Sequence, residues 1–212
     1  MSILWIIRLS LIGGAFILIV IFAYFLKNRE KYQRLLENTV INTISVILFN
    51  AFCYTSVLIP PDINIIQKPS FLYNPLNIRW FDIVGLIFIV LGVIILLSSI
   101  LKRRSIGAQD TDGMLLTTGV YSFCRHPIYF GIIILSLGFS LRSINIDSLL
   151  IFPLILLLNY IQAKIEEVYD VGIRFNEEYS KYKNEVRIFG PIWFWCTLII
   201  VFIFPLVITL LI

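Results

Sequence analysis

The sequence is poor in charge. Charged residues make up 14% of its 212 residues, against roughly a quarter in a typical soluble domain. Hydrophobic residues make up 59%, and the mean hydropathy is +0.93. So few charged side chains exclude an ordinary soluble domain, and the composition predicts a polytopic membrane protein.

Histidine and cysteine are also scarce. The chain has one histidine, His126, and three cysteines that lie far apart in the sequence, Cys53, Cys124 and Cys196. Since there is no CxxC spacing and no HExxH motif, the sequence indicates neither a zinc site nor a disulfide framework. We therefore predict no metal site and interpret the cysteines as packing residues.

Long apolar runs dominate the chain instead. A helix that crosses a hydrocarbon core of ~30 Å needs about 20 residues, and four runs are of that length. Two shorter runs are separated only by residues 142–145, which predicts a helical hairpin. The predicted spans are Ile3–Leu26, Val40–Ile59, Phe81–Leu101, Ile128–Leu141, Ile146–Ile161 and Ile192–Ile212. We therefore predict an all-α fold of about six transmembrane helices in a single membrane domain over residues 1–212.

The first run is too long for a signal peptide and has neither a basic start nor a small-residue cleavage site, so we expect it to stay as the first helix. The segment Pro60–Arg79 contains four prolines, which predicts an irregular loop on the outer side.

The loop charges predict the orientation. The first, third and fifth loops hold four, four and five lysines and arginines, whereas the second and fourth hold two and one. Because lysine and arginine accumulate on the cytoplasmic side, the odd loops are predicted to be cytoplasmic and both termini non-cytoplasmic. This bias and anionic lipid headgroups account for the net charge of +4, so no nucleic-acid partner is expected.

After Ile161 the pattern becomes amphipathic. Apolar or aromatic residues recur at helical spacing with charges between them: Val168, Phe175, Tyr179, Tyr182 and Val186. We predict that the fifth membrane helix continues out of the bilayer into an amphipathic cytoplasmic helix.

The third loop ends in the stretch GVYSFCRHPIYFG, residues 119–131. Proline is favoured at the first helical position, so Pro127 is predicted to start a membrane helix directly after His126. The first-turn amides, the helix dipole and the charge of Arg125 together form a receptor for a carboxylate or a phosphate. Three aromatic residues and a glycine that permits close approach could enclose the rest of a ligand: Tyr121, Tyr129, Phe130 and Gly131. The alternative is a simple interfacial anchor made of arginine, proline and tyrosine.

Carboxylates follow where the fifth membrane helix emerges. Glu166 by itself is typical of a solvated helix end. Glu167 shares one helix face with Asp170 and Arg174, three and seven residues later. This face either forms an ion-pair ladder of its own or lines a polar pocket against the third loop, and the sequence leaves both open.

Several of these motifs occur in a fixed order between residues 85 and 191. They are Leu116-Thr-Thr-Gly-Val-Tyr121, Arg125-His-Pro-x-Tyr129-x-Gly131, Gly138, Glu166-Glu167, and Phe175-x-x-x-Tyr179-x-x-Tyr182-x-x-x-Val186-Arg187. In this order and spacing the chain resembles isoprenylcysteine carboxyl methyltransferases and the related bacterial and archaeal phospholipid-methyltransferase-like membrane proteins. The resemblance implies a methyltransferase core over residues 81–191, preceded by N-terminal helices and an outer loop in 1–80 and followed by an extra helix in 192–212.

The resemblance implies an S-adenosylmethionine pocket at the cytoplasmic boundary and a lipophilic or prenylated acceptor that enters from the bilayer lipids. The helix-start amides and His126 would hold the carboxylate of the cofactor, and Glu167 its ammonium group or ribose. The family's cofactor contacts, with Arg125 added for its charge, correspond to Leu115, Leu116, Tyr121, Arg125, His126, Pro127, Ile128, Tyr129 and Glu167.

Two positions depart from the family pattern. A family histidine is Gly113 here, and the arginine that orients a substrate carboxylate is Ala163. Arg174 and Lys164 are nearby cations that could take its place, so Arg174 is a candidate catalytic residue. A carboxylate or thiolate acceptor needs no base, whereas an amine must lose a proton, and Glu166 is the candidate for that role.

Two other functions fit parts of this pattern. Membrane sterol reductases share some of the C-terminal motifs and bind NADPH in a similar pocket. A non-catalytic membrane assembly protein would use the same polar clusters only as interfacial anchors and would bind no cofactor.

Overall fold

The computed structural model describes residues 3–36, 39–58, 80–103, 114–143, 146–197 and 199–200. Within these ranges the chain is helical and has no strand, so the all-α prediction is confirmed. The helices are α1 (Ile3–Lys27), α2 (Arg29–Leu36), α3 (Thr39–Leu58), α4 (Trp80–Arg103), α5 (Val120–Phe123), α6 (Pro127–Ser143), α7 (Ile146–Glu166) and α8 (Gly172–Glu185), with a π-helical turn, η2, at Glu167–Val171. Residues 192–197 are also helical.

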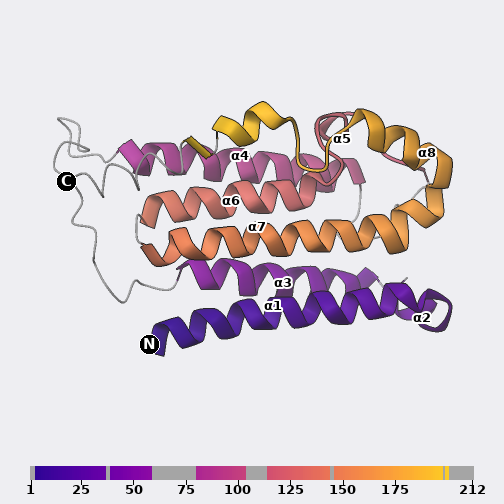
Figure 1. The fold of residues 1–212 in the computed structure, drawn as a ribbon, viewed down its shortest axis with the longest axis horizontal. Coiled ribbons are helices and arrows are strands. Elements are labelled where there is room, and N and C mark those ends of the chain that lie inside the picture. Colours follow the sequence, from indigo (N-terminus) through magenta and orange to yellow (C-terminus); the bar gives the residue numbers. More distant parts are fainter. Residues whose placement is uncertain are drawn as a thin grey trace.

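Five long helices lie side by side along the longest dimension of the molecule, in the order α4, α6, α7, α3 and α1 (Figure 1). The ends of α1, α4 and α7 and the starts of α3 and α6 meet at one end, together with α2 and α8 (Figure 1). The described parts of the first, third and fifth loops, which the charge pattern groups together, therefore share one end of the bundle. This end is called the polar end below.

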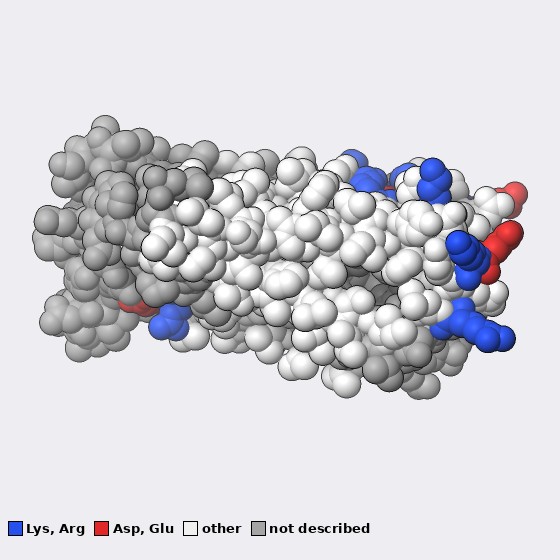
Figure 2. All heavy atoms as spheres, turned by 90° about the horizontal axis from the view of Figure 1, so that it is seen from below, with Lys and Arg blue, Asp and Glu red and all other residues white. Residues whose placement is uncertain are grey.

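Charge is confined to the ends of the visible surface. Figure 2 shows Lys, Arg, Asp and Glu side chains gathered mainly at the polar end, and a wide band without charge along the middle. Two helical segments of the described chain are long and apolar enough to cross a membrane, Ile3–Lys27 and Asp82–Lys102. Both expose many large hydrophobic side chains, which is unusual for a surface in water. The chain is therefore an integral membrane protein.

The number of spans stays a prediction. The apolar segments Ile44–Ser56 in α3 and Pro127–Arg142 in α6 are shorter than the two long ones. Of the predicted final span, only 192–197 and 199–200 are described, and the predicted outer loop and Gly113 lie outside the described residues.

Glycines bring α4 and α6 together. A Cβ atom at Gly138 would lie 2.7 Å from the Gly85 carbonyl oxygen, and one at Gly131 would lie 3.2 Å from the Gly92 carbonyl oxygen. The backbones thus approach each other closely at two levels, the packing that small residues permit between membrane helices. Gly131 was predicted to let a ligand approach, but it serves the contact with α4 instead.

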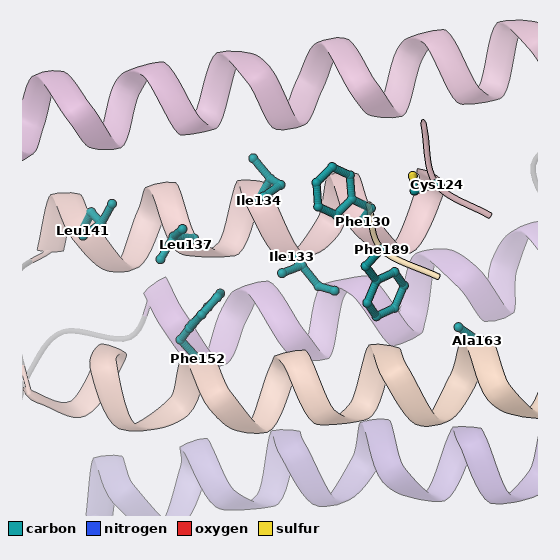
Figure 3. Close-up of a cluster of buried hydrophobic side chains, with 9 residues drawn as sticks. All are labelled: Cys124, Phe130, Ile133, Ile134, Leu137, Leu141, Phe152, Ala163 and Phe189. Atoms are coloured by element: carbon teal, nitrogen blue, oxygen red, sulfur yellow. The ribbon is translucent and has the colours of Figure 1, made fainter. Parts of the chain in front are cut away.

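The core lies on both sides of α6 and α7. One buried cluster is drawn in Figure 3 and consists of Cys124, Phe130, Ile133, Ile134, Leu137, Leu141, Phe152, Ala163 and Phe189. A second cluster joins α7 to the N-terminal helices through Ala15, Ile19, Phe49, Cys53, Ile151, Ile155 and Leu158. Cys53 and Cys124 are packing residues as predicted, whereas Cys196 is exposed. Since α7 contributes to both clusters, it fixes the N-terminal helices against the rest of the bundle.

The chain stays helical from α7 into α8, as the sequence predicted, but the helix changes type on the way. The π-helical turn η2 inserts between α7 and α8, and a Cβ atom at Gly172 would collide with the Glu167 carbonyl oxygen inside this turn. Asn176 then kinks α8, with a φ angle of 33°. Tyr179 and Tyr182 are buried as the amphipathic pattern requires, but Val168 is 58% exposed. A π-helical turn shifts the helical register, which explains why the predicted apolar face does not stay on one side.

Candidate functional site

The turn before α6 is built as the sequence predicts. Pro127 is the first residue of α6, and the His126 carbonyl accepts the first helical hydrogen bond from the Phe130 amide at 2.9 Å. The amides of Arg125 and His126 donate to the carbonyls of Arg187 and Ile188 at 3.0 and 3.2 Å. The end of the third loop is thereby tied to the segment that follows α8.

Arg125 connects three segments of the chain. Its guanidinium donates to Glu167 Oε1, with Nε at 2.9 Å and Nη2 at 2.8 Å. Nη1 donates to the Lys183 carbonyl at 2.9 Å and to the Val186 carbonyl. The side chains of Arg125 and Glu167 are 6% and 3% exposed, so this is a buried and largely saturated clamp.

Glu167 is surrounded by cations. In addition to Arg125, Lys164 Nζ donates to Glu167 Oε2 at 2.8 Å, and His126 Nε2 lies 3.4 Å from Oε1. Burial by itself would raise the pKa of Glu167, but the adjacent His126 and the hydrogen bond from Lys164 outweigh it and lower the pKa. Glu167 is therefore a buried carboxylate whose two oxygens already have protein partners.

His126 lies between two carboxylates. Its Nδ1 is 3.6 Å from Glu166 Oε2 on one side, and its Nε2 faces Glu167 on the other. Burial by itself would lower the pKa of His126, but the adjacent carboxylates of Glu166 and Glu167 raise it. The two carboxylates therefore favour the protonated imidazole. Its Nε2 has no partner of good hydrogen-bond geometry among the described residues.

A cavity opens beside this cluster at the polar end. Nine of the eleven sequence-predicted site residues line it: Leu115, Leu116, Tyr121, Arg125, His126, Pro127, Ile128, Tyr129 and Glu166. Gln162, Val171, Tyr179 and Tyr182 complete this wall. Burial and the nearby Glu167 carboxylate raise the pKa of Tyr179, so its hydroxyl stays protonated.

The opposite wall comes from the N-terminal helices, and sequence reasoning missed it. It consists of Leu18, Ile19, Ile21, Phe22, Phe25, Leu35, Leu36, Ile41, Ser45, Val46, Phe49 and Asn50. Most of these residues are apolar and look like any lipid-facing or core position in a membrane helix. Asn50 and Gln162 could have been identified from the sequence, because polar side chains inside apolar spans commonly face functional cavities.

The remaining two predicted residues, Glu167 and Arg174, are not among the residues that line this cavity. Arg174 makes a two-point ion pair with Asp170, with both distances 2.9 Å. Arg29 of α2 binds the same carboxylate at 2.6 Å. The sequence left two interpretations of this helix face open, an ion-pair ladder and a pocket wall against the third loop. Asp170 and Arg174 form the ion-pair ladder, whereas Glu167 faces the third loop.

Ala163, which corresponds to the family arginine, is fully buried among apolar side chains in the cluster of Figure 3. Lys164 points instead to Glu167.

Comparisons with known proteins agree with the motifs. Residues 80–171 match the family described as phospholipid methyltransferase. The protein-S-isoprenylcysteine O-methyltransferase of Saccharomyces cerevisiae is 37% identical over 84 residues, which cover 39% of this chain and 35% of the yeast protein. The Schizosaccharomyces pombe protein of the same name is 30% identical over 131 residues, covering 58% and 55% of the two chains. That of Xenopus laevis is 28% identical over 116 residues, covering 52% and 40%.

The matched region thus spans 35% to 55% of the length of these relatives. No solved structure matches the chain.

Proposed function

We propose that this chain, a relative of the isoprenylcysteine and phospholipid methyltransferases with its family match at residues 80–171, is an S-adenosylmethionine-dependent methyltransferase. Its acceptor is lipophilic and reaches the cavity from the bilayer. The isoprenylcysteine carboxylate named in the relatives is the first acceptor to examine.

One observation carries this proposal. The same cavity has a polar wall, where buried polar atoms make no hydrogen bond of good geometry with the described residues, and an apolar wall from α1, α2 and α3. His126 Nε2 and Tyr179 Oη are buried without a hydrogen-bond partner among the described residues. Buried polar atoms in native proteins normally have partners, so a ligand with polar groups at this end would complete them. A lipid chain fits the opposite wall.

The residues present fit S-adenosylmethionine. His126, with the first-turn amides of α6, would hold its carboxylate. Glu166, which lines the cavity beside His126, would face its ammonium group. The apolar and aromatic contacts would come from Leu115, Leu116, Tyr121, Pro127, Ile128 and Tyr129. Arg125 and Glu167 would hold this wall in place through their clamp.

When bound, the cofactor supplies a methyl group on a positively charged sulfur, and transfer of that group removes the charge. The chain's contribution is to position the acceptor in line and to exclude water from the reacting atoms. A carboxylate acceptor needs no base, whereas Glu166 would accept a proton from an amine. We leave Arg174 out of the catalytic set because its guanidinium is paired with Asp170.

The membrane placement follows from the charges. We propose six spans with the polar end in the cytoplasm, since the lysine-rich and arginine-rich loops meet there. The site would then open at the cytoplasmic boundary, where a soluble cofactor and a lipid-borne acceptor can both reach it.

Calorimetric titration of the detergent-solubilised protein with S-adenosylhomocysteine and, separately, with NADPH tests the proposal. We expect saturable binding of S-adenosylhomocysteine that weakens at least tenfold, or about 1.4 kcal/mol, in His126→Ala and Glu166→Gln. The exposed Lys181 on α8 offers a control, Lys181→Ala, that should bind normally. Binding of NADPH alone would instead indicate a reductase, and binding of neither would indicate a non-catalytic membrane protein.

A further inference from the structure

An ion pair connects the two walls of the cavity at the polar end. Arg29 Nη1 of α2 lies 2.6 Å from Asp170 Oδ1 of η2. On the wall formed by α1, α2 and α3, Arg29 comes four residues after the cavity-lining Phe25. On the opposite wall, Asp170 comes four residues after the cavity-lining Glu166. Since α1 and α7 both run toward the polar end (Figure 1), the ion pair lies at the polar edge of the cavity.

The two walls are packed together at the other end of the cavity. Ile19 of α1 and Phe49 of α3 line the cavity and belong to the buried cluster that also contains Ile155 and Leu158 of α7. The cavity thus has a floor of packed apolar side chains and, at its polar edge, a bond between charged groups. Of these two contacts, the ion pair is the one that can open without transferring apolar surface into water.

The segment that carries Arg29 packs as a unit. The rings of Tyr24, Phe25 and Tyr32 contact one another, with centroids between 4.9 and 6.1 Å apart. Residues 24–32 are called the α1–α2 corner below. The backbone of α2 leaves helical geometry at Tyr32, with φ −111° and ψ 19°, so the corner ends where the helix bends. A shift of the corner would move Phe25 out of the cavity wall, whereas Leu36 lies beyond the bend and is buried.

The ion pair can open at low cost. Arg174 binds both oxygens of Asp170, each at 2.9 Å. When Arg29 leaves, the buried carboxylate keeps this second cation, so no uncompensated charge stays behind in the protein. The Arg29 side chain is 34% exposed, and its guanidinium can pass into water. Because partly exposed ion pairs contribute little to stability, this one favours the closed corner without fixing it.

We propose that the α1–α2 corner is a gate for the water-soluble cofactor, and that the ion pair between Arg29 and Asp170 is its latch. The gate admits S-adenosylmethionine to the cavity and releases S-adenosylhomocysteine. This inference rests on the proposed methyltransferase function. Because a gate opens for entry as well as for exit, weakening the latch accelerates both steps by the same factor and leaves the dissociation constant unchanged.

Stopped-flow binding of S-adenosylhomocysteine to the detergent-solubilised protein, followed by intrinsic fluorescence, measures the two rates. We expect Arg29→Gln to raise the association and dissociation rate constants together by about three- to fivefold, the contribution of a partly exposed ion pair. Arg34 is exposed on the same helix, so Arg34→Gln removes the same charge and should change neither rate. In an Asp170→Asn protein, Arg29→Gln should have no further effect, since the latch is already lost.

A distance measurement tests the latch without any ligand. Lys31 in the corner and Ser180 on α8 are exposed, so Lys31→Cys and Ser180→Cys can carry spin labels. The exposed Cys196 is replaced by serine for this purpose, and the two remaining cysteines are buried. Pulsed electron spin resonance should show an additional population at longer distance in Arg29→Gln, and none in Arg34→Gln.

Other outcomes overturn the gate. A faster dissociation alone, with weaker binding, would show that the ion pair shapes the wall around the bound cofactor and does not control its passage. Longer spin-label distances with unchanged rates would show that the cofactor takes another route, and unchanged distances would show that the ion pair is no latch. An unsubstituted protein that does not bind S-adenosylhomocysteine refutes the methyltransferase function and with it the exchange of cofactor through the corner, while the spin-label distances still decide whether the ion pair holds the corner closed.

Discussion

Replacement of Arg125 by alanine tests the clamp that holds the site together. The substitution removes the bonds from the guanidinium to Glu167 and to the Lys183 and Val186 carbonyls. Glu167 then remains a buried carboxylate, with His126 and Lys164 as the cations beside it. We expect the protein to lose stability chiefly because of this partly uncompensated charge.

The magnitude follows from the burial of the pair. Breaking a buried ion pair by removing one partner costs about 3–5 kcal/mol. The Lys164 side chain, 36% exposed, can still neutralise part of the Glu167 charge, so the lower end, about 3 kcal/mol, applies. For a chain of this length the melting temperature falls by roughly 2–4 °C per kcal/mol, which gives a decrease of about 6–12 °C.

Thermal unfolding in detergent, followed by intrinsic fluorescence, measures the effect. Arg187 is exposed, so Arg187→Ala is the matched control and should melt within about 2 °C of the unsubstituted protein. A second measurement isolates the pair. In Arg125→Ala combined with Glu167→Gln the buried charge is gone, so the double variant should be less destabilised than the sum of the two single changes. Strict additivity, or an Arg125→Ala protein that melts like the control, would refute the clamp.

Three further predictions concern pH, packing and the ion pairs of α2. Because the pKa of His126 is raised in the folded protein, its charge stabilises the fold below about pH 6.5, and this stabilisation is lost as the pH rises through the folded pKa. The melting temperature should therefore fall over that pH range. The same fall in a His126→Gln protein would contradict this prediction. Gly138→Ala should lower the melting temperature by several degrees, because the backbone atoms next to the new Cβ cannot move away from it. A Cβ at Gly13 meets nothing within 4 Å, so Gly13→Ala should leave the melting temperature unchanged. Equal melting temperatures of the two variants would disprove the close contact. Asp170→Asn should accelerate hydrogen exchange in α2 by loosening Arg29, and unchanged exchange there would show that this ion pair does not hold α2.

The ends of several helices were predictable because local chemistry sets them. The predicted runs Ile3–Leu26 and Phe81–Leu101 became α1 and α4, each within two residues at either end. Pro127 starts α6 because proline suits the first helical turn and disfavours a helical residue before it. The segment after α7 was predicted less well. There, Gly172 and the ion pairs of Glu167 and Asp170 accompany a π-helical turn, and such contacts between distant segments leave no periodic pattern in the sequence.

The cavity was predictable on one side only. Its polar wall comes from a short motif whose residue types have recognisable chemistry, so Tyr121, His126 and Tyr129 were identified in advance. The apolar wall comes from residues between Leu18 and Asn50 in α1, α2 and α3, about 70 to 110 residues before this motif. An apolar side chain that faces a cavity looks the same in sequence as one that faces lipid.

The sequence by itself determined the helical class, the apolar spans and the group of charged loops, because these depend on hydropathy and on residues close together in the chain. Only the tertiary structure decided which carboxylate faces the cavity. Consecutive helical residues point about 100° apart, so Glu166 and Glu167 cannot both face the same way. Arg125, from the third loop, holds Glu167 in a buried ion pair and leaves Glu166 beside His126 in the cavity wall.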